Sequence, residues 1–178
     1  VAVDAAPINP SDLGLMFGAA DLASVRETER DGQPAVILDV PRAAMRAMAP
    51  RVGQWMAVGN EGSGRVVATG EGKAAVALKD QRVGMFGGEM YTGYRCLPAA
   101  QCLAFPDSIS AEQAASCFVN PMTALGFMET RVMEGQKAMV HTAAASNLGQ
   151  MLLRLCQADD VPLVNIVRSP EQVVLLHN

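Results

Sequence analysis

The carboxyl-terminal part of the chain alternates apolar runs with amphipathic segments. The apolar run 138–141 leads into small residues over 142–147, and apolar side chains then recur at helical spacing through Cys156. A second apolar run, 163–167, precedes Ser-Pro-Glu-Gln at 169–172, a typical helix start with proline at the first helical position. This β-α-β-α order predicts a parallel sheet with a right-handed crossover. Because two parallel strands alone do not make a stable sheet, we expect further strands.

The amino-terminal part has a different pattern, in which short apolar runs are separated by glycine turns. A glycine-rich segment, 58–64, is followed by β-branched residues that predict a strand. The further strands that we expect lie at 1–3, 74–78, 82–86, 90–97 and 102–105. Many short strands of this kind predict a small β-barrel-like domain up to about residue 105.

The segments between these parts predict short helices. Asp12 can cap a helix over 13–17 that ends at Gly18. Residues 19–51 read as a surface excursion with a strand over 35–40 and a short helix over 43–49. Two more helices are expected, at 111–118 behind a capping box that starts at Ser110, and at 122–130 after a break at Asn120-Pro121.

Composition narrows the possible partners. Half of the 178 residues are apolar, the net charge is −4 and the pI is near 5.1, so there is no basic face that would favour nucleic acid. No stretch is apolar enough to span a membrane, and the four cysteines form no C-x-x-C pair, which favours a reduced cytoplasmic protein. The chain begins at Val1 inside an apparent strand and ends at Asn178 inside an apparent helix, so we expect a fragment.

The turn over 142–149 is the first candidate site. A strand that turns directly into a helix aims the first N–H groups of the helix at whatever lies above the turn, which suits a phosphate. Small turn residues let such a ligand approach closely. With a single glycine, Gly149, the turn is also compatible with an ordinary strand-to-helix connection.

Four motifs then occur in a fixed order: INPSD at 8–12, GNEGSG at 59–64, NPMTA at 120–124 and VHTAAASNLGQ at 140–150. In this set the chain resembles the zinc-less branch of the medium-chain dehydrogenase/reductase superfamily, which holds NADPH-dependent quinone oxidoreductases and 2-enoyl thioester reductases. The resemblance implies an α/β fold with a GroES-like substrate domain over 1–105. It implies connecting helices and the first βαβα part of a doubly wound Rossmann domain over 106–178.

The resemblance also implies the substrate side of a site. Asn9, Ser11 and Asn60 are its catalytic hydrogen-bonding groups, whereas Asp12 and Glu61 follow family positions that look structural. Zinc-dependent relatives have Cys and His where this chain has Asn9 and Asn60. Asparagine is a poor zinc ligand, so we expect no metal.

On the cofactor side, Ala143 and Ser146 stand at two of the positions where the family's turn has glycine, and Gly149 keeps the third. Arg168 and Ser169 end the second strand, where a cation suits the 2′-phosphate of NADPH better than the 2′-hydroxyl of NADH. A surface arginine is the plain alternative. The cofactor-binding residues that the resemblance implies are Thr123, Ala143, Ser146, Asn147, Leu148, Gly149, Arg168 and Ser169.

The function that this implies is hydride transfer from NADPH to a small-molecule quinone or another activated carbonyl or alkene acceptor. A non-catalytic NADPH-binding protein and a 2-enoyl thioester reductase are the alternatives. Members of the family often carry a tyrosine shortly after the NPSD motif, and its absence here weakens the enoyl alternative more than the quinone one. We expect the excursion 19–51 to cover or reshape the acceptor pocket. Homodimers in this family form through a sheet edge that lies outside this chain.

Overall fold

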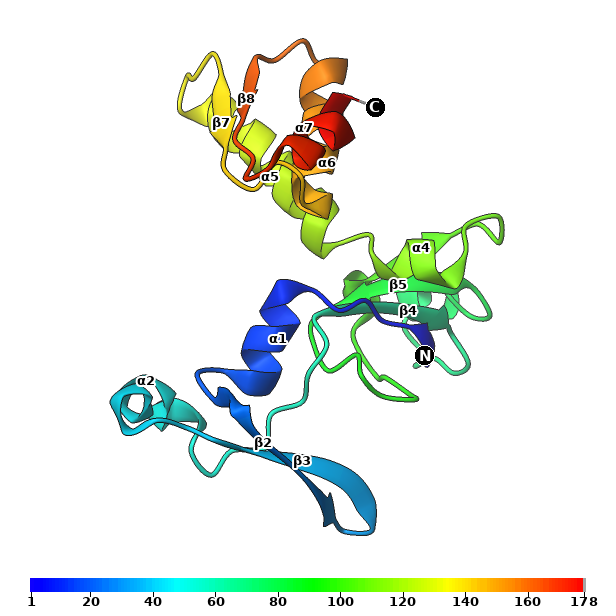
Figure 1. Cartoon of the computed structure of the whole chain (residues 1–178). Coiled ribbons are helices and arrows are strands. Elements are labelled where there is room, and N and C mark those ends of the chain that lie inside the picture. Colours follow the sequence, from blue (N-terminus) through cyan, green and yellow to red (C-terminus); the bar gives the residue numbers. More distant parts are fainter. Residues whose placement is uncertain (178) are drawn as a thin grey trace.

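A computed structural model describes residues 1–177 as an α/β protein with an antiparallel sheet, a projecting hairpin and a separate β-α-β-α lobe (Figure 1). The antiparallel sheet has the order β1-β4-β5-β6. Its strands are β1 (Ala2–Ala5), β4 (Glu61–Arg65), β5 (Arg82–Phe86) and β6 (Cys102–Phe105). Its buried core consists of Val66, Val83, Met85 and Met90.

Strand β4 is formed by the glycine-rich segment itself, and not by the residues after it as expected. The glycines are needed because the backbone of β1 packs closely against this strand. A Cβ atom at Gly64 would lie 1.9 Å from the carbonyl oxygen of Ala2, so only glycine fits there. The glycines therefore serve sheet packing at this position.

Two expected strands of the amino-terminal part are wrong. Residues 74–78 are apolar, but the segment forms helix α3 (Lys73–Val76), in keeping with the high helix propensity of alanine. The segment 90–97 forms no regular strand, although Tyr94 makes a bridge to Ala2 and so lies along the outer edge of β1. The strand pairings within residues 1–177 do not close this sheet into a barrel, so the β-barrel stays a prediction.

The excursion contains a strand that the sequence did not predict. Strands β2 (Asp21–Arg30) and β3 (Gln33–Asp39) form a hairpin that projects away from the sheet (Figure 1). Its turn is Asp31-Gly32 with φ of 52° and 75°, the left-handed pair that suits a two-residue hairpin turn. The excursion ends in η1 (Arg42–Ala44), α2 (Met45–Met48) and η2 (Ala49–Arg51).

Helix α1 (Pro10–Phe17) begins three residues before the expected start and ends at Gly18 as expected. Arg51 donates a hydrogen bond to the carbonyl oxygen of Gly14 at 3.1 Å and another to that of Leu15. The excursion is therefore attached at the carboxyl end of α1. Its expected role as a cover for the acceptor pocket stays a prediction.

Two short elements lie with the antiparallel sheet: η3 (Ala99–Gln101) contacts α3, and α4 (Ala111–Ala115) packs against β1, β4 and β5. The carboxyl-terminal lobe consists of α5 (Val119–Met133), β7 (Met139–His141), α6 (Asn147–Ala158), β8 (Leu163–Asn165) and α7 (Pro170–His177). Strands β7 and β8 pair in parallel, which confirms the predicted β-α-β-α order. Helices α5 and α6 pack together around Ala124, Met128, Leu152 and Cys156. The helix break falls at 116–118 and not at Asn120-Pro121, because proline is tolerated in a first helical turn.

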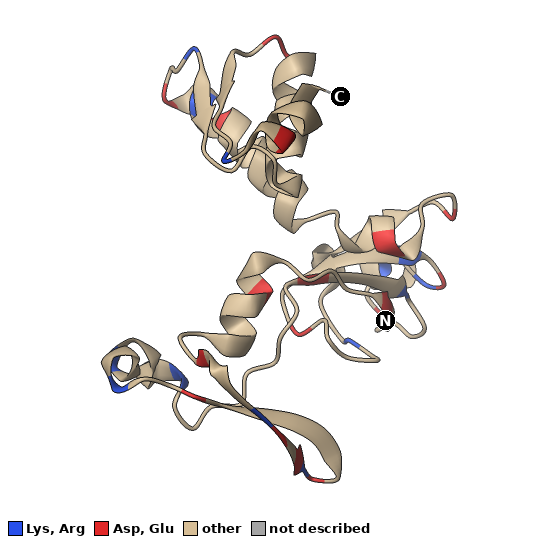
Figure 2. Cartoon of the chain, in the orientation of Figure 1, with Lys and Arg blue, Asp and Glu red and all other residues tan. Residues whose placement is uncertain are grey.

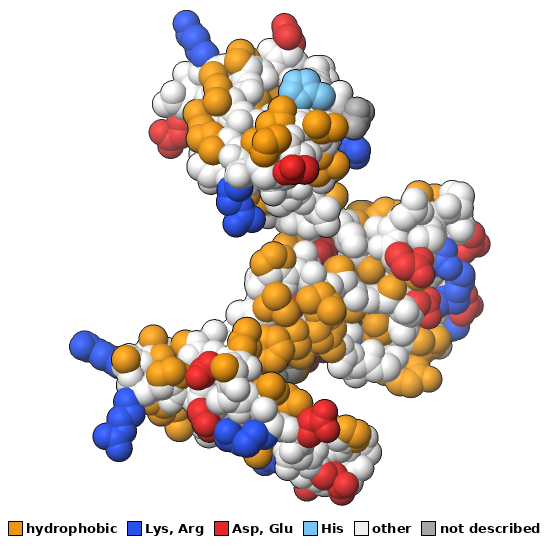
Figure 3. Space-filling model, viewed as in Figure 1, with side chains coloured by type: hydrophobic (Ala, Val, Ile, Leu, Met, Phe, Trp, Pro, Cys, Tyr) orange, Lys and Arg blue, Asp and Glu red, His pale blue; other side chains and the backbone are white. Residues whose placement is uncertain are grey.

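Figure 2 shows Lys and Arg residues and Asp and Glu residues distributed over the elements of residues 1–177. Figure 3 shows hydrophobic side chains gathered around α1. Ile8, two residues before this helix, and Leu13, within it, are exposed. No helix within residues 1–177 has the length and apolar character needed to cross a membrane.

Candidate functional site

The start of α1 is held by a buried carboxylate. One oxygen of Asp12 accepts the backbone N–H of Asn9 at 2.8 Å, and the other accepts that of Asn60 at 2.9 Å. Asp12 has no exposed surface. Asp12 is thus the third residue of α1 and accepts a hydrogen bond from the N-cap residue, whereas the sequence predicts that Asp12 itself precedes the helix as its cap. It also connects α1 to the segment that leads into β4. This fits the structural role expected for Asp12.

Glu61, at the start of β4, is the second buried carboxylate of this region. One oxygen accepts the side-chain amide of Asn9 at 3.0 Å, and the other accepts the N–H groups of Phe118 and Val119 at 2.8 and 2.9 Å. Val119 is the first residue of α5, so the carboxylate neutralises donors at the amino end of that helix. Glu61 thereby joins the antiparallel sheet to the helix that begins the carboxyl-terminal lobe.

The structure brings the three predicted substrate-side residues together, but it gives them different surroundings. Asn9 is buried, and its side-chain oxygen lies 3.5 Å from the amide nitrogen of Asn120. Asn60 is half-buried and donates from its amide to Oγ of the exposed Ser11 at 2.9 Å. Because Ser11 Oγ accepts this bond, its own O–H proton can be directed toward a ligand.

Metal-binding chemistry is sparse around these residues. Within residues 1–177, no three His, Cys, Asp or Glu side chains are placed to hold a metal ion. Burial raises the pKa of the Cys117 thiol to about 11, and the negative charge of nearby Glu61 contributes to this increase. It is therefore a protonated thiol at neutral pH.

The turn between β7 and α6 forms the second part of the site. Ser146 is the N-cap of α6, and its Oγ accepts the N–H of Gly149 at 3.1 Å. A Cβ atom at Gly149 would lie 2.3 Å from the carbonyl oxygen of Ala144, so this glycine is required by the turn. With Gly149 capped, the N–H groups of Asn147 and Leu148 are the first-turn donors left for a ligand.

A cavity of about 390 Å³ lies against this turn. It is lined by Thr142, Ala143, Ala144, Ala145, Ser146, Ile166, Arg168 and Gln172. The structure therefore places Arg168 beside the β7–α6 turn, as the sequence predicts.

Ser169 does not line this cavity, whereas Gln172 does. The hydroxyl of Ser169 instead lowers the pKa of the Glu171 carboxyl group. The side-chain oxygen of Gln172 accepts the backbone N–H of Arg168 at 2.8 Å. The sequence indicates Gln172 only as part of a helix start, so its place at the cavity is not predicted.

Thr123 lies in the second turn of α5, the helix whose amino end is held by Glu61. It is exposed, and its hydroxyl donates to the carbonyl oxygen of Val119 at 2.6 Å. This bond is one that threonine makes within many helices. A role for Thr123 beside a nicotinamide stays a prediction.

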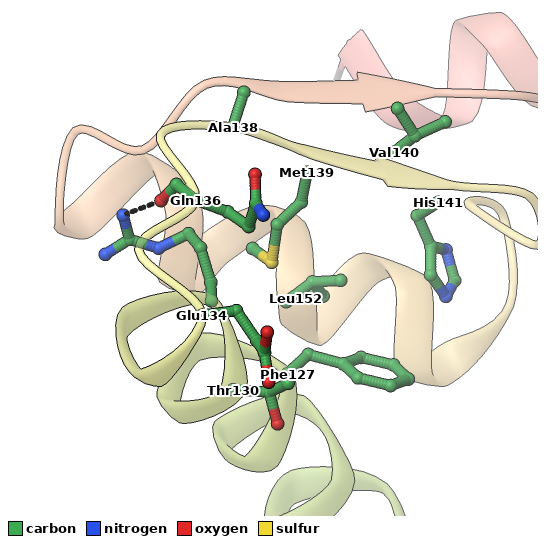
Figure 4. A pocket seen from close by; sticks show the side chains of 10 residues that line it. Phe127, Thr130, Glu134, Gln136, Ala138, Met139, Val140, His141 and Leu152 are labelled. Carbon is green, nitrogen blue, oxygen red and sulfur yellow. Dashed lines mark hydrogen bonds between the residues drawn. The ribbon is translucent and has the colours of Figure 1, made fainter.

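His141, at the end of β7, faces a different cavity. This cavity, of about 280 Å³, lies between α5, β7 and Leu152 of α6 (Figure 4). The His141 ring packs 6.1 Å from that of Phe127, measured between centroids. None of the predicted site residues lines this cavity.

Comparison with known proteins finds similar solved structures and similar curated sequences, although no protein-family profile matches the chain. A candidate NADPH:quinone reductase from Mesorhizobium loti is 29% identical, with a TM-score of 0.69 over 99% of this chain and 44% of its own. The quinone oxidoreductase of Escherichia coli, solved with NADPH, is 15% identical, with a TM-score of 0.59 over 86% of this chain and 55% of its own, and supports the fold.

Curated sequences agree with these structures. The mitochondrial enoyl-[acyl-carrier-protein] reductase of Bos taurus is 26% identical over 93% of this chain and 37% of its own length. The synaptic vesicle membrane protein VAT-1 homolog of Rattus norvegicus is 30% identical over 67% of this chain and 30% of its own length. The chain thus spans about a third of the curated relatives it matches. The chain is thus similar to NADPH:quinone oxidoreductases and to enoyl reductases of the medium-chain dehydrogenase/reductase superfamily, in line with the four ordered motifs.

Proposed function

We propose that this chain forms part of a zinc-independent, NADPH-dependent oxidoreductase that reduces a quinone or another activated carbonyl or alkene acceptor. Residues 1–105 would form its GroES-like substrate domain, and residues 106–178 its connecting helices and the first part of a Rossmann domain. The observation that carries the proposal is the cavity over the β7–α6 turn, with small residues on its floor and Arg168 at its side.

The residues at this cavity fit a dinucleotide. The N–H groups of Asn147 and Leu148 would hold the pyrophosphate at the amino end of α6. Ala143 and Ser146 are small enough for the phosphates to come near the backbone, and Gly149 permits the turn. The guanidinium of Arg168 would bind the 2′-phosphate. When bound, NADPH supplies the hydride.

The acceptor would lie beside Ser11 and Asn60. The Ser11 hydroxyl, held by the Asn60 amide at 2.9 Å, would donate a hydrogen bond to the acceptor's carbonyl oxygen and so orient it. Asn9 would act behind them, because its amide is engaged by Glu61. Asn9 and Asn60 lack the thiolate and imidazole that zinc prefers, which supports a zinc-independent reaction.

A 2-enoyl thioester reductase is the second candidate, favoured by the similarity to the enoyl-[acyl-carrier-protein] reductase over most of the chain. An enoyl substrate needs a proton at carbon, for which a placed acid is valuable. Residues 13–20, where relatives often have a tyrosine, contain none here. A quinone oxygen can take its proton from water, which favours the first candidate.

Turnover assays separate these functions. The full-length protein is incubated with NADPH and either a series of quinones or a series of 2-enoyl thioesters, and absorbance at the nicotinamide band is followed. We expect oxidation with quinones. Oxidation with enoyl thioesters alone would establish the second candidate, and cofactor binding without oxidation by any acceptor would indicate a non-catalytic binding protein.

A further inference from the structure

Gln172 is a residue of the proposed cofactor cavity that the family motifs do not include. It lines the cavity together with Arg168, although it belongs to the next helix, α7. Its side chain is half-buried, and its oxygen accepts the backbone N–H of Arg168 at 2.8 Å. The contact fixes the backbone of Arg168 and sets the orientation of the Gln172 amide.

That orientation leaves one kind of group to face a ligand. An amide has one acceptor oxygen and an NH₂ group with two donors. Because the oxygen is used by the Arg168 N–H, the NH₂ group is the end that remains for the cavity. A neutral donor beside a guanidinium suits a phosphate monoester, which accepts several hydrogen bonds.

Ser169 is the competing residue for this role, and its surroundings are unsuitable. Its hydroxyl lowers the pKa of the Glu171 carboxyl group, which carries a negative charge at neutral pH. A phosphate drawn to Ser169 would therefore meet a like charge, and Ser169 is not among the cavity-lining residues.

We infer that Gln172 is a specificity-determining residue that binds the 2′-phosphate of NADPH jointly with Arg168, in the place that the sequence suggests for Ser169. This inference rests on the proposed function, since it concerns the same cofactor. It assigns Gln172 two tasks, namely holding the Arg168 backbone and donating to the phosphate.

Two substitutions separate these tasks. Gln172→Glu keeps an acceptor oxygen for the Arg168 N–H and replaces only the NH₂ donor by a negatively charged oxygen. Gln172→Met keeps the length of the side chain and removes both hydrogen bonds. Ser169→Ala is the matched control, and NADH is the internal control in every titration because it lacks the 2′-phosphate.

The test is titration of the full-length protein and each variant with NADPH and with NADH, followed by cofactor fluorescence. For NADPH we expect Kd to rise about tenfold in Gln172→Met and about a hundredfold in Gln172→Glu, from loss of a hydrogen bond to a charged group and from added repulsion. For NADH, Kd in Gln172→Glu is expected to stay within about threefold of the unchanged protein, and Ser169→Ala is expected to leave both constants unchanged.

Unchanged NADPH binding in both Gln172 variants would overturn the inference while leaving the proposed function standing. Equal weakening of NADPH and NADH in Gln172→Glu would also overturn it, because the effect would then not depend on the 2′-phosphate. If the unsubstituted protein binds neither cofactor, the proposed function itself is refuted, and the inference with it.

Discussion

The side-chain amide of Asn9 donates a hydrogen bond to the carboxylate of Glu61 at 3.0 Å, across 52 residues of sequence. The second oxygen of the same carboxylate holds the first N–H groups of α5. A single buried anion therefore connects α1, β4 and the helix that leads into the carboxyl-terminal lobe. It also places Asn9 beside Asn120, in the first turn of that helix.

Replacing Glu61 by glutamine tests this connection. The glutamine NH₂ group would have to face either the Asn9 amide or the N–H groups of Phe118 and Val119, which are all donors. We expect a loss of about 2–4 kcal/mol in the free energy of unfolding, measured by urea denaturation of the full-length protein.

The control is Glu129→Gln, because Glu129 is exposed on α5. It is expected to change the free energy of unfolding by less than about 0.5 kcal/mol. Equal effects of the two substitutions would show that Glu61 does not carry the connection.

Gly149 provides a second prediction, with Gly126 as its counterpart on a neighbouring helix. Alanine at 149 would bring a methyl group within 2.3 Å of the Ala144 carbonyl oxygen, whereas alanine at 126 meets nothing within 4 Å. Gly149→Ala is expected to lower stability by about 2 kcal/mol or more, as overpacking does. Gly126→Ala is expected to raise it by about 0.5–1 kcal/mol, because alanine is the better helix former. Thermal unfolding of both variants decides this, and stabilisation by Gly149→Ala would contradict the turn geometry.

Arg168 provides a prediction about cofactor choice. If its guanidinium binds the 2′-phosphate, Arg168→Asp reverses the preference and makes the protein bind NADH more tightly than NADPH. Arg154→Asp makes the same charge change on the exposed face of α6, outside the cavity. It is expected to change both dissociation constants by less than about threefold. A preference that survives Arg168→Asp would exclude this arginine from the 2′-phosphate site.

The cysteines are predicted to differ in reactivity. The thiolate is the reactive form, and burial raises the pKa of Cys117 to about 11, so near pH 8 this residue is almost entirely protonated. Cys96 is exposed. With limiting iodoacetamide, mass spectrometry is expected to find Cys96 modified first and Cys117 hardly at all, with modification of Cys117 increasing as the pH rises toward 11. Early modification of Cys117 at pH 8 would mean that its surroundings are more open than the structure indicates.

The carboxyl-terminal lobe was predictable because its signals are local. Apolar runs, a small-residue turn and helix-start residues each lie within a few positions of one another, and β7, α6, β8 and α7 follow them closely. The amino-terminal part was less predictable. Strand β2 is polar almost throughout, and its extended form depends on pairing with β3. The glycines of β4 are explained only by the approach of β1.

The candidate site shows the same division. The grouping of Asn9, Ser11 and Asn60 followed from family motifs, but the burial of Asn9 depends on Glu61 and on residues more than fifty positions away. That Gln172 lines the cavity, and Ser169 does not, depends on side-chain direction at the start of α7. Motif spacing does not contain that information.

The most direct test of the central claim is parallel titration of the full-length protein with NADPH and NADH, followed by the change in cofactor fluorescence. Cofactor binding at the β7–α6 turn beside Arg168 predicts saturable binding of both, with the lower Kd for NADPH. Absence of binding by either cofactor, or a lower Kd for NADH, would contradict it.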